Sequence, residues 1–315
     1  PRTPEWYAWR HFEPRRDPPV CFGATDAARA LNRSPYGDPF SLFVEKAMGL
    51  AAQDTEALRI ARRMEPVVLD EYDARRECLV TRGLPMFRSA VLGFIGCTPD
   101  ALTPELVVDA KTSTYRRYTE FEPDENQFGP GSDDLPVDYI LQAQQQMFVL
   151  ERECADYPVL FDARNLRIYS VRRSELLIEA ILAAETELLQ RLIADDAPEP
   201  NWQHPLTRQA LREFHGLSAN KTVDLSVAAR DAWLQMQRLR DLISDAENRR
   251  RECQNRILAE MLDAELGRLP LGDKELRRIV VAESRIDETD VADLRARLGQ
   301  LKRKAYERLT ERRVR

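Results

Sequence analysis

Apolar residues recur along much of the chain at the spacing of a helix. Between Asp54 and Tyr72, the residues Leu58, Met64, Val68 and Leu69 share one face of such a helix, and we expect a long helix there. The other segments expected to be helical are Thr25 to Leu31, a stretch that begins near Pro39, Asp138 to Arg152, and Glu175 to Ala194.

The pattern changes between Cys78 and Lys111 to short runs of β-forming residues. These runs are CLVTRG at 78–83, AVLGFIGCTPDAL at 90–102 and LVVDAK at 106–111, separated by turn residues. YPVLFDAR at 157–164 and LRIYSVRR at 166–173 predict a final hairpin. Strands enclosed by helices predict an α/β (α+β) fold with a central mixed sheet flanked by helices.

Acidic residues, glycines and prolines at 116–136 predict an exposed loop. Three parts are expected along the chain: a domain at 1–195, a linker at 196–225 and a helical arm at 226–315. The arm should contain a coiled-coil-like helix from about Ser226 to Leu266, a short strand in RRIVVAES (277–284) and a basic final helix. The apolar stripe of its long helix consists of Leu239, Ile243, Ala246, Cys253, Ile257 and Met261.

Composition narrows the class of protein. The net charge of −6 argues against a protein that coats DNA by bulk electrostatics, although an enzyme needs only a local basic track. Five scattered cysteines without a CxxC pair support neither a disulfide framework nor a zinc or iron-sulfur site, and we expect reduced thiols. No apolar run approaches the roughly 20 residues of a membrane span, so a cytoplasmic location without membrane contact is expected.

Two carboxylates and an ammonium group should meet at adjacent strands. Asp100 should lie opposite Asp109 if the second and third runs pair across a short turn. The two-residue period of a strand then places Asp109 and Lys111 on one face, with Ala110 turned into the core. Hard oxygen ligands that converge in this way suit Mg²⁺ or Mn²⁺.

A divalent ion at this point would supply the chemistry of phosphodiester hydrolysis. Bound metal lowers the pKa of water from about 15.7 towards neutrality. Lys111 would orient or deprotonate that water, and we expect burial beside the metal to lower its pKa. The alternative interpretation of these residues is surface charge on a hairpin.

The order Pro99, Asp100, Asp109, Lys111 resembles the signature of the PD-(D/E)XK nuclease superfamily. The resemblance implies a restriction-endonuclease-like core and a metal held by Asp100, Asp109 and the backbone carbonyl of Ala110. Asp109 stands where glutamate is more common, and its side chain is one methylene shorter, so metal geometry or preference can differ.

Two further segments resemble the lambda exonuclease/YqaJ type within this superfamily. Glu65 matches a glutamate that faces the metal from the preceding helix. Tyr139, Gln142 and Gln146 match the YxxQxxxQ helix of YqaJ-type exonucleases, and their spacing puts all three on one helical face. The resemblance adds Glu65 to the metal site, and the amides on this face can position a water or a phosphate oxygen. A solvated helix surface is the alternative.

The resemblance also implies a pocket for the 5′-phosphate of a DNA end. Arg10, within the tryptophan-rich segment EWYAWRHF, Thr25 and Thr98 occupy its positions, and Leu58 corresponds to an apolar wedge that parts the terminal base pair. The spacing from Arg10 to Thr25 is longer than expected, and Ala61 replaces the usual glycine before Glu65. Core packing is the alternative for Leu58.

These features lead to the hypothesis of a Mg²⁺-dependent exonuclease that digests double-stranded DNA ends from 5′ to 3′ and exposes single strands for homologous recombination. The resemblance implies a homo-oligomer, a trimeric ring around DNA, a single-strand annealing protein as partner, and a phage or prophage source in a bacterial host. Two alternatives remain: a restriction-like or structure-specific endonuclease of the same superfamily, and a non-catalytic oligomeric DNA-binding adaptor.

Overall fold

The computed structural model describes residues 3–50, 55–113, 134–216 and 222–261, together with two short strands at 266–268 and 275–277. It divides the chain into two compact units, Pro1–Asn220 and Lys221–Arg315. None of the helices described is long and apolar enough to cross a membrane. The predicted site residues Glu65, Asp100, Asp109 and Lys111 all lie in the first unit.

The larger sheet of the first unit is mixed, with strand order β2-β5-β6-β8-β7 and with β9 paired to β8. Its strands are β2 Thr81–Arg82, β5 Ala101–Leu102, β6 Leu106–Val108, β7 Lys111–Ser113, β8 Cys154–Phe161 and β9 Asn165–Arg172. Both β6 and β7 pair with β8 in parallel, with one continuous register from Leu106↔Cys154 to Ser113↔Phe161. The hairpin of β8 and β9 confirms the prediction from YPVLFDAR and LRIYSVRR.

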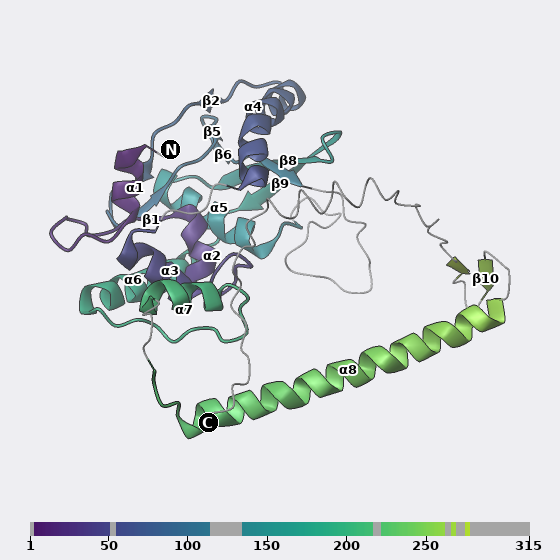
Figure 1. Ribbon diagram of the computed structural model, residues 1–315. Helices are drawn as coiled ribbons and strands as arrows, with labels where there is room; N and C mark the ends of the chain where they lie inside the picture. The colour runs from purple at the N-terminus through teal and green to yellow at the C-terminus, as the bar shows by residue number, and fades with distance from the viewer. Residues whose placement is uncertain are drawn as a thin grey trace, which may run out of the picture. The chain divides into compact units, whose positions relative to one another are not determined.

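Helices cover both faces of this sheet (Figure 1). The long helix α4, Glu56–Arg76, packs Leu69 and Tyr72 against Val108. The opposite face packs against α5, Val137–Leu150, whose Met147 belongs to the core that contains Val107. Because alternate residues of a strand point to opposite faces, Val107 and Asp109 belong to the α5 side and Val108 to the α4 side. The predicted mixed sheet flanked by helices is confirmed.

A second sheet of three strands stands beside the first, in the order β1-β4-β3. Its strands are β1 Phe22–Gly23, β3 Phe87–Arg88 and β4 Ile95–Cys97, and β1 runs parallel to β4. The chain passes from β4 to β5 of the larger sheet through Thr98, Pro99 and Asp100. Thr98 of the predicted phosphate site and Asp100 of the predicted metal site are therefore separated by Pro99 alone.

The remaining helices of the first unit surround these sheets. They are α1 Pro4–Arg10, the 3-10 turn η1 Ala24–Asp26, α2 Ala27–Ala30, α3 Pro39–Met48, α6 Glu175–Ala194 and α7 Thr207–His215. Helix α6 has the bounds predicted for it, and α3 begins at the predicted Pro39. The helix expected at 25–31 is a 3-10 turn followed by four helical residues.

The predicted strand at 106–111 is interrupted. β6 ends at Val108 and β7 begins at Lys111, so Asp109 and Ala110 lie between two strands. The backbone N–H of Asp109 still donates to the carbonyl of Asp156 at 3.0 Å, which keeps the register across the gap. The prediction of one strand was wrong, whereas the predicted neighbourhood of Asp109 and Lys111 was right.

The predicted linker at 196–225 is contradicted over most of its length. Helix α7 lies within it, and its Ala210 is buried in the core that also contains Phe40. The backbone N–H of Asn201 donates to a side-chain oxygen of Asp38 at 2.8 Å. Residues up to 216 therefore belong to the first unit, and the division between units falls after Asn220.

The second unit contains helix α8, Val227–Met261, and the antiparallel strands β10 Leu266–Arg268 and β11 Glu275–Arg277. The helix expected to reach Leu266 ends at Met261 among the described residues, and Leu266 itself begins a strand. Of the strand expected at 277–284, Arg277 lies in β11. The rest of that strand, the basic final helix and most of the loop at 116–136 lie outside the described residues.

Candidate active site

Antiparallel pairing places the two aspartates of the predicted signature side by side. Ala101 of β5 pairs with Val108 of β6, so the next positions along this register are Asp100 and Asp109. A side-chain oxygen of Asp100 accepts a hydrogen bond from the backbone N–H of Ala110 at 2.8 Å. The predicted juxtaposition of the two carboxylates is confirmed.

Asp109 is the centre of a buried polar network. Its side chain is only 2% exposed and contacts the ammonium group of Lys111. Gln142 donates from Nε2 to Oδ2 of Asp109 at 3.1 Å, and Gln146 donates from Nε2 to Oδ1 at 2.9 Å. Both carboxylate oxygens are therefore held by donors of the protein.

Helix α5 presents its glutamines in this way because the residues at 139, 142 and 146 share a face, as predicted. Tyr157 on β8 donates its hydroxyl hydrogen to Oε1 of Gln146 at 3.0 Å, which fixes the direction of that amide. The Nζ atom of Lys111 lies 5.0 Å from the ring centroid of Tyr139 and 5.6 Å from that of Tyr157. The amides were expected to position a water or a phosphate oxygen, and in the structure they orient Asp109.

Burial and like charge shift the acidic groups of this network. Burial, with the charge of Asp109 added, raises the pKa of Asp100 well above its ordinary range. Burial and Asp109 also raise the pKa of Glu65, which is half-buried on α4. The two groups respond to the same carboxylate, so the structure brings Glu65 into electrostatic contact with the predicted pair.

The pKa of Lys111 shifts in the opposite direction to the one expected. Burial lowers the pKa of its ammonium group, but the carboxylates of Asp109 and Asp100 raise it more, and the pKa ends above its ordinary value. The expected lowering was for burial beside a bound metal, whose positive charge would oppose these carboxylates. The two neighbouring anions outweigh burial.

The carboxylates of this site have the chemistry that a divalent ion needs. Glu65, Asp100 and Asp109 offer hard carboxylate oxygens, and the charge of Asp109 helps to raise the pKa values of Glu65 and Asp100, a repulsion that a cation relieves. Among the residues that the structure describes, however, no three His, Cys, Asp or Glu side chains form a group that could hold a metal as they stand. The chemistry of the donors fits Mg²⁺ or Mn²⁺, and binding requires Asp109 to exchange protein donors for the ion.

The residues predicted for a phosphate pocket come from one edge of the smaller sheet. Because β1 and β4 are parallel, their carboxyl ends deliver Thr25 and Thr98 to the same edge. Thr25 is exposed, and Thr98 accepts a hydrogen bond from Nε1 of Trp6 at 3.3 Å. The guanidinium carbon of Arg10 lies 4.9 Å from the ring centroid of Trp6. The structure thus brings Arg10 and Thr98 together through Trp6.

Two charged residues beside this pocket were missed by sequence reasoning. Asp26 accepts from Nη2 of Arg10 at 2.7 Å and from Nζ of Lys46 at 2.7 Å. The signals were present, since Asp26 follows Thr25 directly and Lys46 interrupts an apolar helix. Arg10 itself is only 11% exposed, which the resemblance did not predict.

Leu58 lies in the first turn of α4, and its side chain is 42% exposed. Core packing, the alternative for this residue, is excluded by that exposure. A wedge role remains a prediction.

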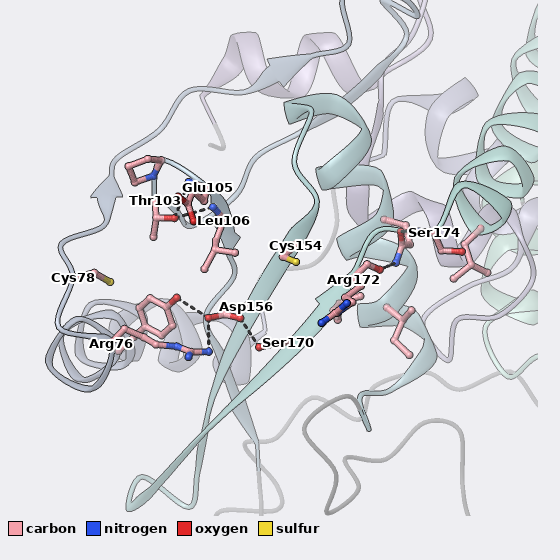
Figure 2. Close-up of a pocket in the computed structure, with 16 residues that line it drawn as sticks. Arg76, Cys78, Thr103, Glu105, Leu106, Cys154, Asp156, Ser170, Arg172 and Ser174 are labelled. Carbon is pink, nitrogen blue, oxygen red and sulfur yellow. Dashed lines mark hydrogen bonds and ion pairs between the residues drawn. The ribbon is translucent and has the colours of Figure 1, made fainter.

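A cavity of about 950 Å³ opens elsewhere, among the end of α4, the start of β8 and the end of β9 (Figure 2). Asp156 lies within it and accepts hydrogen bonds from Tyr72 at 2.8 Å, Arg76 at 2.8 Å and Ser170 at 2.6 Å. None of the predicted site residues lines this cavity. Its polar side chains form a hydrogen-bond network around Asp156 of β8. The backbone carbonyl of Asp156 in turn accepts a hydrogen bond from the backbone N–H of Asp109.

Comparison with known proteins gives the following matches. Residues 5–153 match the YqaJ-like viral recombinase domain. The chain is 25% identical over 278 residues to the uncharacterized protein YqaJ of Bacillus subtilis (strain 168), covering 86% of this chain and 84% of that protein.

Two solved structures are similar at lower identity. The alkaline exonuclease LHK-Exo of Laribacter hongkongensis matches with a TM-score of 0.46 and 19% identity, over 67% of this chain and 99% of that one. A phage-related exonuclease of Haemophilus somnus 129PT matches with a TM-score of 0.42 and 12% identity, over 56% of this chain and 96% of that one.

The domain match spans the segments whose residues carry the resemblance, from the tryptophan-rich start through the aspartate pair to the glutamine helix. Residues 5–153, just under half of the chain, are therefore similar to the YqaJ-like viral recombinase domain.

Proposed function

We propose that the chain is a Mg²⁺-dependent DNA exonuclease that digests double-stranded ends from 5′ to 3′ and produces single strands for homologous recombination. The observation that carries the proposal is the convergence of Asp100, Asp109 and Lys111 at one strand edge, with Asp109 held by two glutamines. The domain match to a viral recombinase family supports it.

Asp100, Asp109, Glu65 and the backbone carbonyl of Ala110 would hold the metal. When bound, Mg²⁺ or Mn²⁺ lowers the pKa of water and offsets negative charge on a phosphate. Asp109 would turn from Lys111 to the ion, while the amides of Gln142 and Gln146 keep its carboxylate in place.

Lys111 then becomes available to the substrate. Its ammonium group lies at the edge between Asp109 and the aromatic rings of Tyr139 and Tyr157. Released from Asp109, it would orient the attacking water or stabilise charge on the phosphate. Tyr139 and Tyr157 limit the positions that the flexible lysine chain can take.

The ends of DNA would be recognised at the neighbouring edge of the smaller sheet. Arg10, Thr25 and Thr98 offer a guanidinium and two hydroxyls to a 5′-phosphate. Only Pro99 separates Thr98 of this edge from Asp100 of the aspartate pair. That short connection suits an enzyme that holds a terminal phosphate while it cleaves a nearby bond.

The proposal includes partners and location. We place the protein in the cytoplasm of a bacterial host, encoded by a phage or prophage, acting as a homo-oligomer, a trimeric ring by resemblance, beside a single-strand annealing protein. The YqaJ-like viral recombinase match supports the recombination role. The helix α8 exposes an apolar stripe that self-association would cover.

The test uses Asp109→Asn, which keeps the size of the side chain and removes its charge. Digestion of a linear duplex in Mg²⁺ should fall by about three orders of magnitude or more, because the metal loses a charged ligand. Thermal unfolding should show a folded variant, and a covalently closed circle should resist the wild type. Full-rate digestion by Asp109→Asn contradicts the site, and rapid cutting of the circle supports an endonuclease instead.

A further inference from the structure

Asp26 is the hub of a buried charged cluster beside the proposed phosphate pocket. One of its oxygens accepts from Arg10, and the other accepts from Lys46 and from the backbone N–H of Gly23 at 2.9 Å. Lys46 is fully buried and also donates to the carbonyl of Cys21 at 3.2 Å. Side chains from α1 and α3 and the backbone of β1 are thereby fixed to the carboxylate of Asp26 on η1.

The guanidinium of Arg10 has little freedom in this cluster. A Cβ atom built on Gly23 would overlap Nη1 of Arg10, so the guanidinium lies directly against the backbone of β1. Its carbon also lies 4.9 Å from the ring centroid of Trp6, and Trp6 donates to Thr98. Asp26 therefore sets the position of Arg10 relative to the sheet edge that carries Thr98.

The cluster carries more positive than negative charge. Two buried cations, Arg10 and Lys46, share the carboxylate of Asp26, and Glu45, whose charge also acts on both, is itself paired with Arg29. Glu185 on α6 is fully buried, and neither of its oxygens has a hydrogen-bond partner in the structure. Burial and the charge of Asp26 raise the pKa of Glu185 well above its ordinary range, which favours the neutral acid. A buried excess of positive charge favours a bound anion.

We propose that Asp26, anchored by Lys46 and by the backbone of Gly23, is a positioning residue that fixes Arg10 for the 5′-phosphate of a DNA end. This inference rests on the proposed function and goes beyond it by naming the residue that orients the phosphate-binding arginine. A guanidinium held in advance loses less conformational freedom when it binds phosphate. Without the anchor, Arg10 keeps its charge but loses its orientation.

Two variants displace Arg10 by different routes. Asp26→Asn removes the charge that holds the guanidinium. Gly23→Ala keeps every charge and places a methyl group where the guanidinium now lies. The φ of −89° at Gly23 is ordinary for an L-residue, and the only close neighbour is the end of a flexible side chain, so this variant should fold.

The measurement compares two linear duplexes that differ only in a 5′-phosphate or a 5′-hydroxyl. The preference for the phosphorylated end is kcat/KM with phosphate divided by kcat/KM with hydroxyl, or, from fluorescence anisotropy, Kd with hydroxyl divided by Kd with phosphate. Both ratios should fall about tenfold or more in both variants, as expected when a charge-assisted contact is lost. The loss of preference should come mainly from a higher KM on phosphorylated ends. Activity on hydroxyl ends should stay near that of the wild type, which a merely structural role would not allow.

Asp73→Asn is the matched control. Asp73 also holds an arginine, Arg82 at 2.6 Å, and a backbone N–H, that of Val80 at 3.1 Å, but in another part of the unit. Its loss should leave the phosphate preference unchanged. Arg10→Gln combined with Asp26→Asn should lose no more preference than Arg10→Gln alone, because the two residues act as one unit.

The outcomes separate this inference from the proposed function. If folded Gly23→Ala and Asp26→Asn keep the preference for phosphate, the positioning role is overturned while the nuclease assignment stands. A wild type that shows no preference for phosphate has the same consequence. A wild type that digests neither duplex defeats the proposed function, and the anisotropy ratio then still decides the role of Asp26. If Asp26→Asn does not fold, Gly23→Ala carries the test by itself.

Discussion

Three side chains donate hydrogen bonds to Asp109, and two kinds of sequence pattern predicted their positions. Lys111 follows from the two-residue period of a strand, and Gln142 and Gln146 follow from the period of a helix. Periodicity states which residues share a face, but it does not state what that face contacts. The glutamines were therefore predicted as a set, while their common acceptor became visible only when α5 was placed over β6.

Glu185 offers a test at the level of a single residue. Arg10 on α1, Asp26 on η1 and Lys46 on α3 are the charged groups that act on it, and burial with the charge of Asp26 raises its pKa. Between the ordinary carboxyl pKa and this raised value, the folded state keeps a proton that the unfolded state has released. The free energy of unfolding should therefore fall as pH rises through this window, by up to about 1.4 kcal/mol per pH unit.

Glu185→Gln removes this titration and keeps a neutral side chain of similar size. Urea unfolding from pH 4 to pH 8 should show the variant gaining stability over the wild type as pH rises, with the two nearly equal at the acidic end. Glu179→Gln, an exposed position on the same helix, should leave the wild-type pH profile unchanged. Parallel profiles for wild type and Glu185→Gln would show that burial does not hold this acid neutral.

At the level of elements, agreement between sequence and structure followed the strength of local signals. Helix α6 and the hairpin of β8 and β9 were predicted closely, because their apolar periods run without interruption between turn residues. The gap at Asp109 and Ala110 could not be predicted, because the two short strands are held in register by β8, whose paired residues lie 48 positions further along the chain. Long-range pairing of this kind leaves no mark in a local pattern.

The first turn of α4 carries a prediction of its own. Thr55 caps this helix by accepting from the backbone N–H of Leu58 at 3.3 Å, so the exposed Leu58 is held on an ordered turn. Leu58→Ala should change the free energy of unfolding by less than about 0.5 kcal/mol, because the side chain is outside the core. Digestion of a blunt duplex should slow several-fold, as an apolar wedge is lost.

A duplex with frayed, mismatched terminal base pairs separates this wedge from a general defect. Leu58→Ala should digest it at the wild-type rate, because no pair remains to be parted. Ile60→Ala, also exposed on the first turns of α4, serves as the matched control and should leave both substrates unaffected. Equal slowing on blunt and frayed duplexes contradicts the wedge.

On the scale of the whole molecule, the sequence indicated two parts but misplaced their boundary. ADDAPEPNWQHP, at 194–205, has the composition of a linker, yet Asn201 hydrogen-bonds to Asp38 and α7 closes the core around Phe40. Proline and polar residues also occur in ordered segments that cross a surface. Composition reports local chain preference, whereas the contacts that decide this boundary join residues 163 and 169 positions apart.

The long helix of the second unit carries the last prediction. Leu239 and Ile243 are 51% and 59% exposed, and they belong to a stripe that continues through Ala246 and Ile257. An apolar stripe with this spacing is the sequence feature of helices that pair. Leu239→Asp combined with Ile243→Asp should therefore lower the oligomer mass measured by light scattering, since each side chain contributes about 1.5–3 kcal/mol when fully buried.

Gln237→Asp combined with Ser244→Asp adds the same charges to another face of α8, and it should keep the wild-type mass. Because the proposed active site lies wholly in the first unit, the stripe variant should still cleave short duplexes at the wild-type rate per chain. On long duplexes its digestion should become distributive, since fewer chains enclose the DNA at once. An unchanged mass in the stripe variant assigns self-association to the first unit and leaves α8 free for another partner.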